Sequence, residues 1–163
     1  MRSLTSDNRA SSRFVWPPTI YGLATGISAA LTWLMPVRFL AAPTARVALF
    51  VGIAIILAGL LIVLAAGRLF KRAGTPVAPT KPSMALVTDG IYGSIRNPMY
   101  LSLTLVLLGI GIATVSIWFL IALPIAVFAV TKLAIEPEER YLTEKFGAAY
   151  LEYKTRVRRW GMI

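Results

Sequence analysis

Three long apolar runs constrain this chain more than any other feature of its sequence. Residues 14–37 and 47–67 contain no charged residue, and residues 100–133 contain only Lys132. About 20 apolar residues in a helix, rising 1.5 Å each, span a bilayer. With 57% hydrophobic and only 15% charged residues, the chain has more apolar surface than a soluble domain of 163 residues can bury. The runs therefore predict an integral membrane protein.

The third run is too long for one comfortable span. The polar stretch 114–116 near its middle predicts a turn between two short helices, roughly 100–113 and 117–133, with Pro124 kinking the second. The predicted fold is therefore an all-α integral membrane protein with four transmembrane helices. It is followed by a cytoplasmic, amphipathic C-terminal helical segment.

The basic residues indicate the orientation of these helices. Three lie in the tail at residues 1–13, five between residues 68 and 97, and seven from Lys132 onward, whereas the loop at 38–46 has two and the turn at 114–116 has none. The positive-inside rule then places both termini in the cytoplasm of a bacterial-type inner membrane. A net charge of +10 is also typical of nucleic-acid binders, but these charges flank apolar runs, so we expect membrane lipid and no nucleic acid as the partner.

The chain divides into a cytoplasmic tail (1–13), the first two transmembrane helices (14–70) and a region with the remaining helices (71–163). In the first helix, Gly22, Gly26 and Ala30 form a small-residue stripe. We expect the stripe to pack inside the chain's own bundle, with a homodimer face as the alternative. Pro137 suits the first turn of a C-terminal helix, and Gly147 is expected to break that helix.

The composition excludes several kinds of chemistry. The chain has no cysteine and no histidine, which removes disulfides, thiolate nucleophiles and the usual metal ligand and neutral-pH base. It has no P-loop and no G-x-S-x-G motif, and no metal site is predicted. The spans have no acid or base at their apolar centres, which argues against proton-coupled transport. Two polar stretches remain as candidates for chemistry, at 86–100 and 136–139.

These stretches carry a family resemblance. The motifs, in chain order, are Arg72-Ala73-Gly74-Thr75, Leu86-Val87-Thr88-Asp89-Gly90-Ile91-Tyr92, Arg96-Asn97-Pro98-Met99-Tyr100, Glu138-Glu139, Phe146-Gly147 and Tyr150-Leu151-Glu152-Tyr153. Their order and spacing resemble the isoprenylcysteine carboxyl methyltransferases, which are related to the membrane phospholipid methyltransferases. The resemblance covers roughly residues 72–160.

The resemblance implies methyl transfer from S-adenosylmethionine, with the cofactor held at the cytoplasmic face and closed in by the C-terminal segment. Carried over by position, the cofactor-binding residues are Met84, Ala85, Leu86, Val87, Tyr92, Asn97, Pro98, Met99, Tyr100, Glu138 and Glu139. The implied catalytic residues are Arg96, Asn97 and Glu138.

Two positions depart from the family pattern. Asn97 stands where the family commonly has histidine, so this side chain keeps its hydrogen bonds but does not titrate. Ala134 stands where the eukaryotic prenylcysteine enzymes have an arginine associated with the substrate carboxylate. Lys132 and Arg140 are the candidate substrate-binding residues that would replace it.

The chemistry of the side chains agrees with this assignment. Arg96 can pair with the cofactor's carboxylate, Glu138 or Glu139 with its hydroxyls or ammonium, and tyrosine rings with its sulfonium. Direct methyl transfer depends on alignment more than on acid–base catalysis, so it needs no histidine. We therefore predict a methyltransferase acting on a lipophilic acceptor, most like a prenylcysteine carboxyl group. The alternatives are a phospholipid amine acceptor, or a non-catalytic membrane sensor or assembly protein of the same fold.

Overall fold

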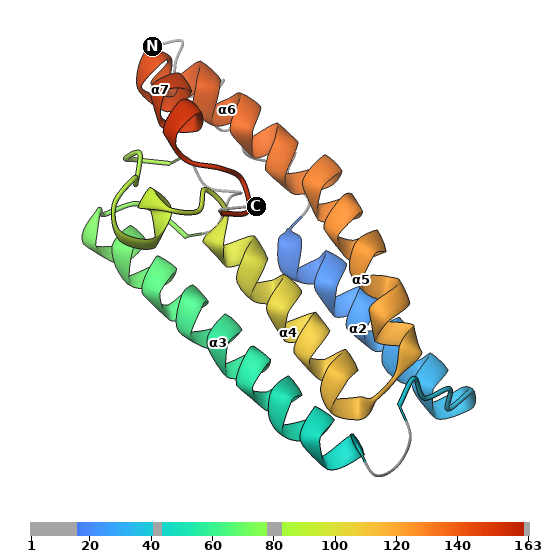
Figure 1. Cartoon of the computed structure of the whole chain (residues 1–163). Coiled ribbons are helices and arrows are strands. Elements are labelled where there is room, and N and C mark those ends of the chain that lie inside the picture. Colours follow the sequence, from blue (N-terminus) through green and yellow to red (C-terminus); the bar gives the residue numbers. More distant parts are fainter. Residues whose placement is uncertain (1–15, 41–43, 78–82, 162–163) are drawn as a thin grey trace.

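The computed structural model describes residues 16–40, 44–77 and 83–161, and these residues form helices and loops without a β-strand (Figure 1). The predicted tail at residues 1–13 lies outside the described residues. The elements in chain order are α2 (Pro17–Leu34), α3 (Ala45–Arg72), the 3₁₀ turn η2 (Gly90–Gly93), α4 (Pro98–Thr114), α5 (Ile117–Val130), the π-helical segment η3 (Thr131–Ile135), α6 (Glu136–Phe146) and α7 (Ala148–Arg156).

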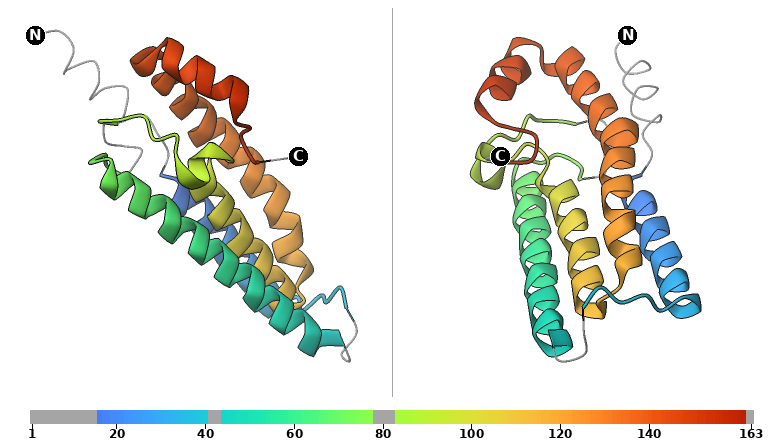
Figure 2. Two further views of the ribbon diagram at one scale, coloured as in Figure 1. Left: turned by 60° about the vertical axis from the view of Figure 1, so that its left-hand side comes forward. Right: turned by 45° about the vertical axis from the view of Figure 1, so that its right-hand side comes forward.

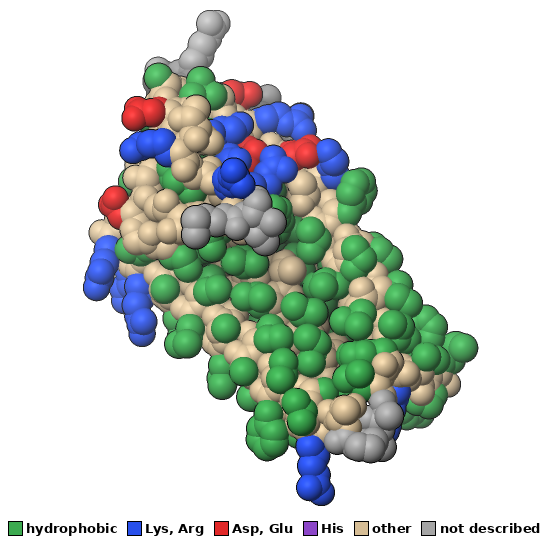
Figure 3. All heavy atoms as spheres, in the orientation of Figure 1, with side chains coloured by type: hydrophobic (Ala, Val, Ile, Leu, Met, Phe, Trp, Pro, Cys, Tyr) green, Lys and Arg blue, Asp and Glu red, His purple; other side chains and the backbone are tan. Residues whose placement is uncertain are grey.

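The four predicted long helices appear as α2, α3, α4 and α5, and they lie side by side as a bundle (Figures 1 and 2). Among the residues that the structure describes, two helices are long and apolar enough to cross a membrane: α3, and the continuous helix Ile117–Phe146 that α5 begins. α4 is apolar but shorter. Exposed hydrophobic side chains such as Leu57, Leu61 and Phe128 cover the outside of the bundle (Figure 3). The chain is thus an all-helical protein with membrane-type helices.

Glycines set the closest helix contact, which is between α3 and α4. A Cβ atom on Gly52 would lie 2.5 Å from the carbonyl oxygen of Gly109, and one on Gly109 would lie 2.7 Å from the carbonyl oxygen of Gly52. Gly59 faces the carbonyl oxygen of Ser102 in the same way, at 2.8 Å. Small residues at these crossings allow the two backbones to touch.

The prediction for the stripe on α2 was wrong. Gly22 and Gly26 have no atom within 4 Å of an added Cβ, and both they and Ala30 are exposed. The buried face of α2 is instead formed by Tyr21 and Ser28, which face α4 and α5: Tyr21 bonds to Thr104, and Ser28 to a carbonyl of α5. The homodimer alternative for the stripe stays a prediction.

The turn between α4 and α5 confirms the predicted helical hairpin. Val115 adopts a left-handed conformation (φ 54°) that ends α4, and α5 begins at Ile117. The loop after α2 pairs with this turn, since Ile117 donates its N–H to Val37 and Phe39 donates to Val115. These connections therefore meet at one end of the bundle, and the polar segments lie at the other end (Figure 1).

α6 begins at Glu136 with Pro137 in its first turn, as predicted, but it is not a separate helix. The helix that begins at Ile117 continues through the π-helical segment η3 into α6 and ends at Phe146. Pro137 has no N–H for the carbonyl of Leu133, and a wider π turn accommodates this missing bond. Gly147, with φ 54° and ψ −126°, then separates α6 from α7, which confirms the predicted break.

Candidate functional site

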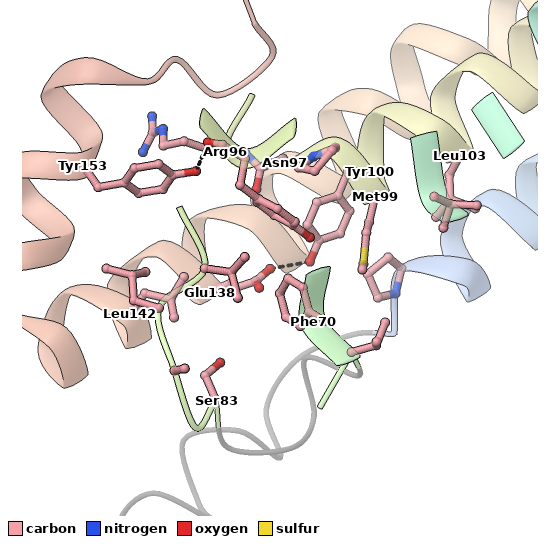
Figure 4. A pocket seen from close by; sticks show the side chains of 18 of the residues that line it. Phe70, Ser83, Arg96, Asn97, Met99, Tyr100, Leu103, Glu138, Leu142 and Tyr153 are labelled. Carbon is pink, nitrogen blue, oxygen red and sulfur yellow. Dashed lines mark hydrogen bonds between the residues drawn. The ribbon is translucent and has the colours of Figure 1, made fainter. Parts of the chain in front are cut away.

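A cavity of about 370 Å³ lies at the end of the bundle where the polar segments meet. This volume is within the usual range of small-molecule sites, about 300–1,000 Å³. Predicted residues that line it are Ala85, Leu86, Val87, Tyr92, Arg96, Asn97, Pro98, Met99, Tyr100 and Glu138. Figure 4 shows Tyr100, from the start of α4, and Glu138, from α6, meeting in the cavity. Segments about 40 residues apart in sequence are thus brought together, as the predicted hairpin requires.

Four predicted site residues do not line the cavity. Met84 is 72% exposed, while its backbone N–H donates to the Thr75 hydroxyl. Lys132 pairs with Glu136 at 2.6 Å, and Arg140 is exposed. Glu139 is buried beside the cavity wall and not in it.

Sequence reasoning missed about half of the lining. The additional residues are Trp16, Pro17, Pro18, Val63, Phe70, Val77, Ser83, Leu103, Leu142, Tyr150 and Tyr153. Leu142, Tyr150 and Tyr153 lie in the C-terminal segment that the sequence predicts to be amphipathic and to close in the cofactor, and this was the signal that could have found them. Phe70 and Tyr92 form an aromatic pair with ring centroids 5.3 Å apart, which brings α3 to the cavity wall.

The segment before α4 is shaped by its glycine and its proline. Gly90 has a φ of 57°, which favours glycine, and it starts the η2 turn that buries Tyr92. Pro98 occupies the first turn of α4, where its missing N–H costs nothing. Asn97 precedes it and does not cap the helix with its side chain. Its amide instead donates to the carbonyl of Arg159 at 3.2 Å.

Glu138 and Tyr100 form the polar centre of the cavity. The Tyr100 hydroxyl donates to Glu138 Oε2 at 2.5 Å (Figure 4). Burial raises the pKa of Glu138 above its ordinary value, the Tyr100 hydrogen bond opposes this rise, and the nearby Glu139 charge adds to it. Burial also raises the pKa of Tyr92, with the Glu138 charge as a further cause. Glu138 is therefore a carboxyl group that can take up a proton more readily than an exposed glutamate.

Arg96 and Arg159 share the carboxylate of Glu139. Arg159 donates from Nε (3.0 Å) and Nη2 (2.8 Å), and Arg96 Nη1 lies 3.1 Å from Glu139 Oε1. Glu139 raises the pKa of Arg159, mainly through this hydrogen bonding. Arg96 Nε is nevertheless buried without a hydrogen-bond partner in the described structure, and Arg96 Nη1 has only the ion pair with Glu139, without hydrogen-bond geometry. Buried N–H groups of this kind are costly to leave unpaired, so they are candidates for a ligand contact.

The C-terminal segment closes over this end of the molecule. Tyr153 on α7 donates its hydroxyl to the carbonyl of Tyr92 at 2.7 Å. Residues 157–161, the C-terminal strap, then turn back toward α4, and Arg96 donates its N–H to the carbonyl of Arg158 at 3.0 Å. Trp160 packs against the apolar core of the bundle. Burial raises the pKa of Tyr153 to about 12, against the opposing effect of Arg96.

Comparison with known proteins identifies the family. The family described as phospholipid methyltransferase matches residues 47–149, which is more than half of the chain. The chain belongs to this family. Membership implies a membrane methyltransferase of the phospholipid or isoprenylcysteine type, and it agrees with the resemblance in residues 72–160.

One curated relative matches a smaller part of the chain. An uncharacterized protein from Haemophilus influenzae is 39% identical over 64 residues, which is 38% of this chain and 98% of the relative. No solved structure gives a significant match to the chain.

Proposed function

We propose that this methyltransferase transfers a methyl group from S-adenosylmethionine to a lipophilic acceptor that reaches the cavity sideways from the bilayer. The observation that carries the proposal is that the cavity has a polar part and an apolar part. Its polar part is formed by Glu138, Arg96 and tyrosines, and its apolar part by Trp16 just before α2, Val63 of α3 and Leu103 of α4. The polar part therefore suits the cofactor, and the apolar part suits the tail of a lipophilic acceptor.

The described residues fit the proposed cofactor. The buried Arg96 Nε, which has no hydrogen-bond partner in the described structure, suits a carboxylate, and the rings of Phe70, Tyr92 and Tyr153 suit a sulfonium or an adenine. Glu138 suits an ammonium or ribose hydroxyl. When bound, S-adenosylmethionine supplies an electrophilic methyl group. The closed C-terminal segment then keeps water away from the polar part of the cavity.

We also propose the predicted four-span topology, with both termini cytoplasmic. α2 and α4 would cross beside the two longer helices, since all four lie side by side (Figure 2). Helices of 17 or 18 residues reach about 26 Å, somewhat less than a typical hydrocarbon core of about 30 Å. Bilayer thinning and the tryptophans near the ends of α2 would make up this difference.

The charges around the cavity favour an amine over a carboxylate as the acceptor group. Among the described lining residues, Arg96 is the only cation, and it is adjacent to Glu139 and proposed to hold the cofactor. Lys132, a candidate partner for a substrate carboxylate, is paired with Glu136 outside the cavity. Glu138 would repel a carboxylate and attract an ammonium.

An amine acceptor must lose a proton before it can accept a methyl group. Glu138 is placed to accept this proton from the ammonium, because its pKa is raised and its carboxylate faces the cavity. Bound S-adenosylmethionine would supply the methyl group that the deprotonated nitrogen takes up, and its sulfur would become a neutral thioether. Tyr100 holds Glu138 in position by its hydrogen bond.

The test supplies methyl-labelled S-adenosylmethionine to purified protein in vesicles containing phosphatidylethanolamine, or in micelles with a prenylcysteine analogue. Label in the amine lipid supports the proposal, and Glu138→Gln should abolish it. Glu136→Gln, at a carboxylate outside the cavity, is the matched control and should retain activity. Label in the prenylcysteine instead would support the carboxyl acceptor. Cofactor binding without transfer to either would favour a different acceptor, and no cofactor binding would favour the non-catalytic alternative.

A further inference from the structure

One buried carboxylate joins the cavity wall to the C-terminal strap. The side chain of Glu139 is only 9% exposed, and both of its oxygens are occupied by Arg159, with Arg96 sharing Oε1. The two arginines come from different segments: Arg96 precedes α4, and Arg159 lies in the strap. Glu139 is therefore the point where α6, the start of α4 and the strap are held together.

Both oxygens of Glu139 already accept a hydrogen bond from Arg159. Glu139 does not line the cavity, and Arg159 binds it in a two-pronged geometry that fixes its orientation. A direct contact from Glu139 to a cofactor hydroxyl or ammonium would require its side chain to turn toward the cavity, away from this geometry. The arrangement therefore points to a role other than that of a ligand.

The charges of Glu139 and its two arginine partners indicate the role of Glu139. Two guanidinium groups face one carboxylate, so one positive charge is not neutralised within the cluster. Arg96 lines the cavity, its buried Nε lacks a hydrogen-bond partner in the described structure, and its Nη1 has only the ion pair with Glu139. The Arg96 side chain extends toward Tyr153 and not toward Glu138 (Figure 4). Glu139 and Tyr153 thus surround an arginine that is still able to bind an anion.

We propose that Glu139 is a positioning residue that holds Arg96 ready for the carboxylate of S-adenosylmethionine, and that Arg159 couples this arrangement to closure of the strap. The inference rests on the proposed cofactor. The backbone supports the coupling, because the carbonyls of Arg158 and Arg159 accept hydrogen bonds from Arg96 N–H and the Asn97 amide. Arg96 and the strap are thus bound to each other by both side chains and backbone.

A pair of ligands distinguishes a positioning residue from a direct ligand or a structural one. S-adenosylmethionine and its decarboxylated analogue share the ribose, the sulfonium and the amino group, and they differ only in the carboxylate. If Glu139 acts through Arg96, Glu139→Gln should weaken binding of S-adenosylmethionine by about tenfold, the size of one charged hydrogen bond. Binding of the decarboxylated analogue should change by less than about twofold.

The measurement is equilibrium dialysis with the full-length protein in detergent. Glu136→Gln is the matched control, and it should leave both dissociation constants unchanged because Glu136 pairs with Lys132 away from the cavity. Arg159→Lys keeps the charge but loses the two-pronged contact, so it should show the same selective loss at a smaller size. This second variant keeps the test decisive if Glu139→Gln does not fold.

Each outcome has a separate meaning. Equal weakening for the two ligands, or no weakening for either, would overturn the positioning role. Equal affinity of the unmodified protein for both ligands would overturn it too, since the carboxylate would then not be recognised, while the proposed function would stand. No binding of either ligand by the unmodified protein would overturn the proposed function itself, and this inference with it.

Discussion

Replacing Gly109 by alanine should separate α3 from α4. The new Cβ would lie 2.7 Å from the carbonyl oxygen of Gly52, 2.7 Å from Ile56 Cγ1 and 3.0 Å from the backbone nitrogen of Ile56. Ordinary contacts between such atoms are about 3.5–4.0 Å. Two of the three neighbours are backbone atoms, which cannot rotate away, so the helices must move apart. Overpacking of this kind costs about 1–3 kcal/mol.

A glycine in open space provides the matched control. Gly67 lies in α3 and has no atom within 4 Å of an added Cβ. Both substitutions gain the same helix propensity, about 1 kcal/mol, so this contribution cancels in the comparison. The difference in unfolding free energy between Gly109→Ala and Gly67→Ala should therefore equal the overpacking cost, about 1–3 kcal/mol, with Gly109→Ala the less stable.

The assay is reversible unfolding in mixed micelles, followed by circular dichroism as the fraction of denaturing detergent rises. Separate curves for the two variants give the difference in free energy. If Gly109→Ala is as stable as Gly67→Ala, or more so, then α3 and α4 do not meet at these glycines, and the helix arrangement that positions the cavity is wrong.

Three further substitutions test the site. Tyr100→Phe removes a hydrogen bond that lowers the pKa of Glu138, so that pKa should rise and the acid limb of the rate–pH profile should move to higher pH. An unchanged limb would contradict the base role. Tyr153→Phe removes the hydrogen bond to the Tyr92 carbonyl, at a cost of about 1 kcal/mol, and should increase amide hydrogen exchange in α7. If the amides of α7 are as protected as in the unmodified protein, this hydrogen bond does not hold the C-terminal segment closed. Leu103→Trp should fill the apolar part of the cavity and raise the KM for the acceptor, with little change in cofactor affinity. A loss of cofactor affinity instead would contradict the assignment of the apolar part of the cavity to the acceptor.

The helices and the meeting of the two polar stretches followed from the sequence. Uncharged runs and a polar turn at 114–116 were enough to predict the hairpin that places Tyr100 beside Glu138. The family motifs then indicated most of the polar lining. These predictions succeeded because a bilayer restricts the length of a spanning helix and the placement of charged residues, and because each family motif is a short stretch of sequence.

The features that failed depend on contacts between distant residues. Nothing in the α2 sequence shows that Gly22 and Gly26 face outward while Gly52 and Gly109 face each other, since all lie in similar apolar surroundings. The sequence also did not predict the π-helical segment before Glu136, which joins α5 and α6 into one continuous helix.

The role of Glu139 could not be predicted either. Its partner Arg159 is 20 residues away, and only the folded strap brings the two together.

The central claim is that the cavity binds S-adenosylmethionine. Titration of the purified protein in detergent with labelled cofactor tests it most directly. We expect saturable binding at one site per chain, strongly weakened by Arg96→Ala and by Glu138→Ala and unaffected by Glu136→Gln. The absence of saturable binding by the unmodified protein, or affinity unchanged in both cavity variants, would contradict the account.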